Sequence, residues 1–357
     1  MDKLIRIIRS VISDDKLNYK ITQTDIKKAQ YHKAESFLYL ACDKEITDKK
    51  IVESIKKIQF KAIQKDAIQL KELDEILQIF ERNQIDCLPL KGSVIKSDYP
   101  FTFLRYMGDI DILIREKDMK KAVQLLETKE YITKSDSYNH LSMEKLPYVE
   151  VELHRHLLPY QQEGEDLLTG IWDRLLLKEG SGHIYQMSEE DFLIFMLLHL
   201  HKHYQVSGTG IRSFLDIYLF LQNHKDLNFN YIDDSLNRVN LKETCLKYIK
   251  FSDKLFNLEK MDNDFLTMKE RVKNSGVFGS SKVRMETDLS NNKQSSIRLI
   301  FRKIFPLKRM MIQRYPVLKH HIFLLPIFYV LRLLRLIIIS PVSSIKRVVE
   351  IIKFQKK

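Results

Sequence analysis

The sequence predicts an α+β fold: a small mixed β-sheet that carries acidic residues, flanked by helices, with a helical C-terminal half. Two observations support this prediction. Apolar residues recur at helical spacing in residues 51–83 and again from residue 188 onwards. Between these stretches lie three short segments, residues 87–90, 108–115 and 147–158, which are apolar throughout or alternate apolar and polar side chains.

The N-terminal region, residues 1–85, is expected to form several helices, of which residues 51–83 are the clearest. Residues 87–90 predict a short strand. Pro89 indicates an edge position for this strand, because proline has no N–H to donate to a neighbouring strand. The strand runs into the Lys-Gly-Ser tripeptide at 91–93, after which a helix or turn is expected.

The next two strands carry the acidic residues. Residues 108–115 (GDIDILIR) form an apolar run that contains Asp109 and Asp111. In residues 147–158 the side chains alternate, which predicts a half-buried strand with Glu152 on its polar face.

Helices connect and follow these strands. Residues 116–131 predict a helix that begins with acidic side chains. Ser188 is expected to cap a strongly apolar helix, and residues 210–224 predict a further helix. Residues 270–295 are the most polar stretch, and we expect them to form a loop before the C-terminal segment.

Charge is distributed unevenly along the chain. The 357 residues carry a net charge of +12. Residues 291–357 contain 15 Lys and Arg and one acid, Glu350, so this segment has a net charge of +14 and the remainder about −2. The basic segment and the body therefore need separate explanations.

Three scattered cysteines, Cys42, Cys87 and Cys245, form no CxxC pair and are odd in number. This favours a reducing, cytoplasmic location without a disulfide framework or a cysteine-based zinc site. The first 16 residues have no long uninterrupted apolar run, so we do not expect a signal peptide.

Asp109 and Asp111 predict a metal site. Side chains at alternate positions of a strand point the same way, with Cα atoms roughly 6–7 Å apart, so the two carboxylates converge. Their repulsion is removed by a divalent cation such as Mg²⁺. Two such ions about 3.5–4 Å apart activate an attacking oxygen and stabilise a leaving pyrophosphate. Glu152 is the candidate third carboxylate, with Glu150 as a substitute. The alternative is an exposed strand edge at which the aspartates pair with Lys or Arg.

Gly92 and Ser93 are candidate phosphate ligands. A glycine lets the backbone approach a phosphate, and the serine offers a hydroxyl and an N–H. The alternative is an ordinary strand-to-helix turn.

The order of these segments resembles the nucleotidyltransferase superfamily, which has the polymerase-β-like fold. More closely, LPLKGSVI (88–95), LRYMGDIDILI (104–114), VELHRHL (151–157) and GIRSFLDIYLFL (210–221) resemble the uncharacterised bacterial nucleotidyltransferase family. The similarity covers about residues 30–250, and RYPVLKHHIFLLPIFYVLR (314–332) is a candidate extension of it.

The resemblance implies a role for each matching residue. The ligands of Mg²⁺ or Mn²⁺ would be Asp109, Asp111 and Glu152, and Glu152 would also polarise the attacking hydroxyl. The residues that contact or neutralise the nucleotide phosphates would be Lys91, Gly92, Ser93 and Arg105.

Several histidines are accessory candidates. His154 lies two residues after Glu152 and either orients a metal ligand or substrate, or closes a hydrogen bond at a domain seam. His199, His201 and His203 raise a zinc alternative, because residues four apart on a helix can chelate a metal. They belong to no HExxH motif and no third ligand is evident. Without zinc, either His203 lies at the polar end of a helix facing the nucleotide, or these histidines are structural.

Arg212 and Asp216 lie four residues apart on the helix predicted at 210–224, so one alternative is that they pair with each other. In related enzymes a helical domain after the catalytic sheet closes over the base and the acceptor. The resemblance therefore implies that Arg212 or Asp216 reaches the nucleotide.

Residues 321–340 are nearly long enough to span a bilayer, but Pro326, Arg332 and Arg335 interrupt the apolar run. An arginine near the bilayer centre costs roughly 2.5–3.5 kcal/mol, which disfavours a membrane span. We expect the segment to pack on the helical body with its arginines pointing outward. The alternatives are an anionic membrane surface and a nucleic acid, which the aliphatic neighbours of the basic residues make less suitable.

The sequence thus predicts four regions. They are an N-terminal helical region (1–85), a nucleotidyltransferase core (86–185), a helical domain that closes over the substrates (186–270) and a basic amphipathic segment (291–357). The predicted function is Mg²⁺-dependent transfer of a nucleoside monophosphate from an NTP to an unknown hydroxyl or phosphate acceptor, which is a sugar phosphate, another small molecule, tRNA or a protein.

Two alternatives to this function stay open. One is a catalytically silent, nucleotide-binding regulator of the toxin–antitoxin type. The second is a membrane-surface adaptor that acts through residues 291–357. The expected location is the cytoplasm, with the inner face of the membrane as a peripheral site.

Overall fold

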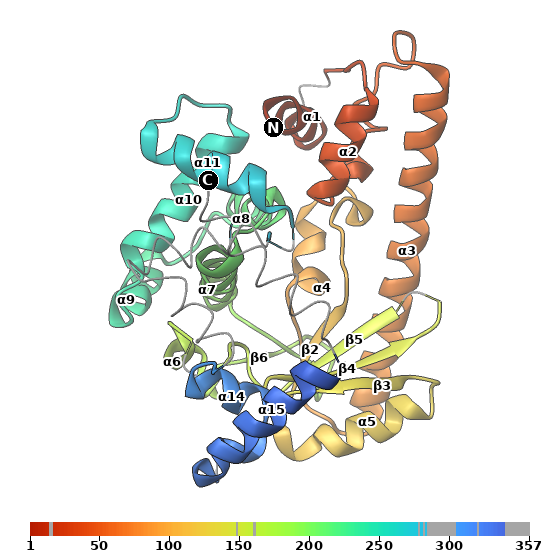
Figure 1. Ribbon diagram of the computed structural model, residues 1–357. Helices are drawn as coiled ribbons and strands as arrows, with labels where there is room; N and C mark the ends of the chain where they lie inside the picture. Colours follow the sequence, from red (N-terminus) through yellow and green to blue (C-terminus); the bar gives the residue numbers. More distant parts are fainter. Residues whose placement is uncertain are drawn as a thin grey trace.

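The computed structural model describes residues 1–13, 17–147, 149–159, 162–277, 279, 280, 283, 305–319 and 321–339. In Figure 1 the long helix α3 runs along one side of the molecule, and helices α7 to α11 lie on the other. The strands are β1 (Cys87–Pro89), β2 (Ile110–Ile114), β3 (Ile132–Asp136), β4 (His140–Lys145), β5 (Val149–His154), β6 (Leu176–Leu177) and β7 (Tyr185–Gln186).

The α-helices of the described residues are α1 (Asp2–Ile12), α2 (Gln23–Tyr31), α3 (Lys49–Arg82), α4 (Gly92–Ile95), α5 (Met119–Glu127), α6 (Glu165–Leu168), α7 (Glu189–Ser207), α8 (Ile211–Asn223), α9 (Phe229–Arg238), α10 (Lys242–Phe256), α11 (Asn263–Ser275), α14 (Lys308–Arg314) and α15 (Leu325–Ile339). The prediction of an α+β fold with a small sheet is therefore confirmed.

The main sheet has five strands in the order β1-β2-β5-β4-β3. Strands β2 and β5 are parallel, whereas the other neighbouring pairs are antiparallel, so the sheet is mixed as predicted. Strand β1 lies at the edge, as Pro89 predicted. The parallel register places Asp111 directly opposite Glu152.

The two faces of this sheet differ because side chains alternate along each strand. One face is apolar and packs against α3 and α5. Its residues on the two central strands are Ile110, Ile112, Ile114, Val149, Val151 and Leu153. Asp111 and Glu152 therefore point to the opposite face. Leu113 on that face belongs to a second core that fills the helical half, so the acidic face is turned towards those helices.

Local capping explains where two predicted helices begin. The side chain of Asp48 accepts hydrogen bonds from the first backbone N–H groups of α3. Ser188 caps α7, because its hydroxyl accepts a hydrogen bond from the N–H of Asp191 over 3.1 Å. Both helices were predicted near these positions.

The loop predicted over residues 270–295 begins too early. Helix α11 continues to Ser275, because Phe265, Met268 and Val272 recur at helical spacing and are buried. Most of the remaining stretch lies outside the described residues.

Helices α14 and α15 form a small unit with its own apolar cluster (Figure 1, blue). In the described part of the chain no helix has the length and apolarity needed to cross a bilayer. The expectation that α15 turns its arginines outward is wrong for Arg332, which is half-buried while four apolar residues of the helix are exposed. Arg335 lies in a helical turn whose side chains are not described.

A buried ion pair fixes the segment after β1 to α3. Lys96 is only 2% exposed, and its Nζ lies 2.5 Å from Oδ1 of Asp66. Thr102 donates a hydrogen bond to the other oxygen of Asp66. Because Lys96 and Thr102 lie on the segment that links α4 to β2, Asp66 holds that segment in place.

Replacing Lys96 by Met is expected to lower the free energy of unfolding by about 3–5 kcal/mol, because Asp66 is left buried without its counter-charge. The double variant Lys96→Met/Asp66→Leu should recover most of this loss, since it removes both charges. Chemical denaturation of the three proteins measures the effect. A double variant no more stable than Lys96→Met would contradict this account of the ion pair.

Candidate active site

Asp109, Asp111 and Glu152 form one group, which we call the carboxylate trio. Oxygen atoms from all three lie within 4.8 Å of one another. Asp109 lies in a bend directly before β2, with its carboxylate close to that of Asp111, and the parallel register of β2 and β5 brings Glu152 beside Asp111. A compact set of carboxylate oxygens suits Mg²⁺ or Mn²⁺. Glu150, the alternative third carboxylate, is exposed and lies outside the trio.

Asp111 is the most strongly compensated member of the trio. Its Oδ1 lies 2.5 Å from Nζ of Lys91 and 2.7 Å from Nε2 of His154. Burial alone would raise the pKa of Asp111, but the charge of Lys91 and the hydrogen bond from His154 hold it well below its usual range. Asp111 is therefore ionised throughout the physiological range.

Asp109 has the opposite electrostatic environment. Burial and the neighbouring charge of Asp111 raise the pKa of Asp109 to about 6, and the attraction of Lys91 offsets only part of this rise. Ionised Asp109 therefore carries an energetic cost that a bound cation would remove.

Two histidines hold Glu152 from either side. Nε2 of His140 lies 3.4 Å from one carboxylate oxygen, and Nε2 of His154 lies 3.3 Å from the other. Burial favours the neutral acid, but the hydrogen bond from His154 outweighs it and the pKa of Glu152 is lowered. Burial also lowers the pKa of His140. His154 was predicted as an accessory residue, whereas His140 was not. It lies on β4 directly opposite His154, in a pairing that sequence spacing does not reveal.

The Lys-Gly-Ser tripeptide forms the turn from β1 into α4, close to the trio. Lys91 adopts a φ of +47°, which side-chain-bearing residues rarely adopt, and this conformation turns the chain into the helix. A Cβ at position 92 would lie only 3.0 Å from side-chain atoms of Met107, so a larger residue would require Met107 to shift by a few tenths of an ångström. Ser93 is half-buried, its N–H donates to the carbonyl of Leu90, and its hydroxyl donates to Sδ of Met107 over 3.7 Å. Its contact with phosphate stays a prediction.

Arg105 is buried and fully engaged. Its Nε and Nη2 donate to the two oxygens of Asp216 over 2.7 and 2.8 Å, and Nη1 donates to the carbonyl of Tyr106. Tyr99 donates a further hydrogen bond to Asp216. The alternative that Arg212 and Asp216 pair with each other is therefore wrong, because Asp216 pairs with Arg105. These contacts give Arg105 a structural partner, and its contact with phosphate stays a prediction.

Arg212 instead lies beside Tyr106. Its Nη1 donates to the Tyr106 carbonyl over 3.2 Å, and its buried Nε has no hydrogen-bond partner among the described residues. Burial and repulsion from Arg105 lower the pKa of Arg212 to about 10. Lys33 and Lys65 lie 5.0 and 4.5 Å from the centre of the Tyr106 ring, so three cations surround one aromatic side chain.

Lys65 and Lys202 approach the trio from two helices. Burial and repulsion from Lys33 lower the pKa of Lys65, while the charge of Asp109 opposes this. Lys202 on α7 has a pKa lowered to about 8 by burial and by repulsion from Lys91, and the charges of Glu152 and Asp111 oppose that shift. The sequence reasoning missed both lysines, because no local motif marks a lysine that faces carboxylates on another element.

The histidines of α7 behave differently from one another. His199 and His203 face each other with their Nε2 atoms 3.2 Å apart. Burial lowers the pKa of both, to about 3 for His203. His201 is structural, since it contacts Tyr248 and Glu163. The sets of three potential metal ligands found in the described chain are the trio and His140–Glu152–His154, so the zinc alternative finds no third ligand there.

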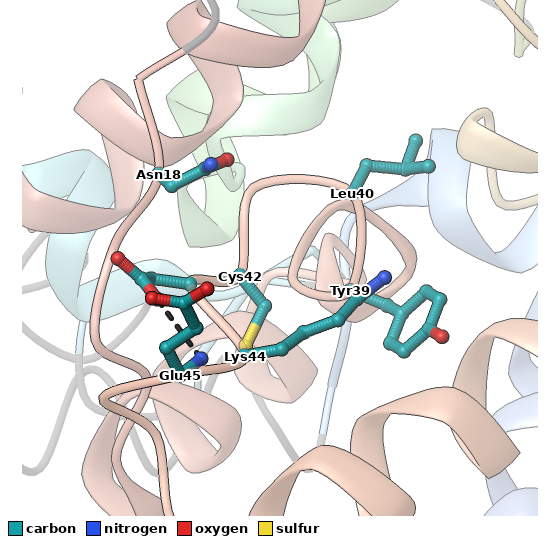
Figure 2. Close-up of a pocket in the computed structure, with 7 residues that line it drawn as sticks. Asn18, Tyr39, Leu40, Cys42, Lys44 and Glu45 are labelled. Atoms are coloured by element: carbon teal, nitrogen blue, oxygen red, sulfur yellow. Dashed lines mark hydrogen bonds between the residues drawn. The ribbon is translucent and has the colours of Figure 1, made fainter.

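A pocket of about 440 Å³ lies elsewhere, in the N-terminal helical region (Figure 2). Its lining includes Tyr39, Cys42 and Lys44, and every lining residue comes from positions 18–45. Lys44 Nζ lies 4.6 Å from the centre of the Tyr39 ring, so this pocket contains a lysine but none of the residues of the trio.

Comparison with known proteins identifies the family of this chain. A model described as uncharacterised nucleotidyltransferase matches residues 26–257. Among solved structures, the chain is similar to an antibiotic-resistance factor, ANT(2'')-Ia, with 10% identity over 51% of this chain and 97% of that chain and a TM-score of 0.37. No curated protein matches. The family model spans more than half of the chain and confirms the resemblance, and the chain therefore belongs to the uncharacterised nucleotidyltransferase family.

Proposed function

We propose that this protein transfers a nucleoside monophosphate from an NTP to a hydroxyl or phosphate acceptor, releases pyrophosphate, and needs Mg²⁺ or Mn²⁺ to do so. The observation that carries this proposal is the convergence of Asp109, Asp111 and Glu152 on one face of the sheet in a chain of this family. The acceptor class, whether sugar phosphate, other small molecule, tRNA or protein, stays open.

The trio fits a divalent cation because its oxygens are close and carry more negative charge than Lys91 neutralises. A bound cation would polarise the phosphate and neutralise the charge that develops in the transition state. Glu152 is ionised at neutral pH, since its pKa is lowered, and it accepts the proton of the attacking acceptor. The new O–P bond forms as the bond between the α-phosphorus and the bridging oxygen breaks.

The cations around the trio suit a triphosphate. Lys91 and Lys202 face Asp111 and Glu152, whereas Lys65 faces Asp109 and Arg212 lies nearby. Together they would neutralise the phosphate oxygens and orient the leaving pyrophosphate, so that catalysis comes mainly from positioning and charge. A catalytically silent regulator is less suitable, because a regulator has no need of three converging carboxylates.

Asp109→Asn is expected to lower nucleotidyl transfer by at least about a hundredfold, because the trio loses a metal ligand. The assay uses each α-³²P-labelled NTP with Mg²⁺ or Mn²⁺ and a lysate from the source organism as the acceptor supply. Asp136→Asn is the matched control, since Asp136 lies on β3 and pairs with Arg155 away from the trio. Nucleotide binding without any transfer by the wild-type protein would support the regulator instead.

The same Asp109→Asn variant should be more stable than the wild-type protein without metal at pH 7, by about 3 kcal/mol. The raised pKa of Asp109 means that its ionisation opposes folding. This cost is complete above pH 6 and fades as the pH falls towards the unfolded value near 4, so the difference should fade likewise. Thermal unfolding measures it. Mg²⁺ should raise the melting temperature of the wild type and leave that of the variant unchanged.

Lys202 predicts a pH dependence of nucleotide affinity. Its pKa of about 8 in the free protein means that the ammonium is lost as the pH rises from 7 to 9. NTP affinity should therefore fall about tenfold over this range, and Lys202→Gln should show low affinity with a flatter profile. Titration calorimetry at several pH values measures both. If the affinity of the wild type and that of Lys202→Gln depended on pH in the same way, Lys202 would not contact the phosphates.

A further inference from the structure

Helices α14 and α15 pack on each other rather than on either large core. Their cluster is built on Met311, Ile312 and Leu318, with Phe328 and Tyr329 of α15 packed against it. Lys319 lies over the ring of Tyr138, at the turn between β3 and β4. The unit therefore sits at the outer end of the sheet and has a face of its own.

The outward face of α15 is apolar. Ile327, Val330, Leu331 and Leu334 are between 48% and 56% exposed. Their positions i, i+3, i+4 and i+7 place them on one side of the helix, which we call the α15 stripe. Phe323, one turn earlier, is 73% exposed and extends the stripe. A helix that simply covers a soluble core turns such residues inward.

The inward face of α15 carries aromatic and charged groups instead. Phe328 and Tyr329 are half-buried, and Tyr329 donates a hydrogen bond to the carbonyl of Pro306. Arg332 is half-buried on the same side of the helix, close to Arg314 and Tyr315. Among the described residues the small cluster is thus complete without the stripe, and none of them covers the stripe, so it can take an external partner.

The segment that carries the stripe is strongly basic. Residues 305–339 contain six Lys and Arg and no Asp or Glu. Lys308, Arg314 and Lys319 are exposed. The longer segment from 291 to 357 has a net charge of +14. A partner of the stripe must therefore be apolar below its surface and negatively charged at its surface.

We propose that the α15 stripe docks on the surface of an anionic lipid bilayer. Its aliphatic side chains would enter the boundary between headgroups and acyl chains, while the surrounding lysines and arginines contact lipid phosphates. A second copy of this chain would bring the same positive charge to the interface, so charge complementarity favours the lipid. The helix lies on the bilayer and does not cross it, in keeping with its length. The proposal does not depend on nucleotidyl transfer.

The test is sedimentation of the full-length protein with phosphatidylcholine vesicles, with and without phosphatidylglycerol. We expect binding at least about tenfold tighter with phosphatidylglycerol, weakened by salt. Val330→Glu/Leu334→Glu should lower the partition coefficient about tenfold. The matched control is Phe60→Glu/Leu266→Glu, which adds the same charge at exposed apolar positions of α3 and α11 and should bind like the wild type.

Several results would overturn the proposal. They are the absence of vesicle binding, equal binding to both vesicle types, and an equal loss of binding in the control variant. The stripe would instead serve self-association under one combination of results. The wild-type protein would form a dimer in analytical ultracentrifugation and not bind vesicles, and the Val330→Glu/Leu334→Glu variant would be a monomer. Melting temperatures of both variants within a few degrees of the wild type would show that a loss of binding does not come from unfolding.

Discussion

The repulsion among three carboxylates, one buried and two half-buried, is the constraint on which the rest of the site depends. Asp111 stays ionised because Lys91 and His154 contact it directly, whereas Asp109 has no such contact among the described residues and its pKa rises. The charges of the trio are thus unequally compensated in the free protein. The charge of Asp111 is neutralised by its neighbours, whereas ionisation of Asp109 remains unfavourable. That residual cost would favour a bound cation there, and a site of this kind is less stable than an apolar core.

Holding the trio in place requires ties between distant parts of the chain. Arg105 and Asp216 are 111 residues apart, yet their double hydrogen bond joins the segment before β2 to α8. Asp66 joins the same segment to α3 through Lys96. These buried ion pairs are costly to form, but each fixes one geometry, so the backbone that leads into Asp109 is held between the two helical bodies.

The sequence predicted those parts of the site that are encoded locally. The spacing of Asp109 and Asp111, the alternation around Glu152 and the proline at the sheet edge each express a rule that acts over a few residues. His140 could not be predicted, because its place depends on the pairing of β4 with β5, and β3 and β4 are too polar to stand out as strands. The same holds for Lys202, whose role depends on how α7 packs over the sheet.

The position of the cations separates the two functions proposed for the chain. The cations described near the trio, from Lys33 to Arg212, belong to the body, whose overall charge is only about −2. The proposed phosphate binding at the trio therefore does not need the positive charge of residues 291–357. A net charge of +14 destabilises a compact state through self-repulsion unless an anionic surface offsets it. Together with the apolar stripe of α15, that charge favours a partner for the C-terminal segment that is extended, anionic and apolar beneath.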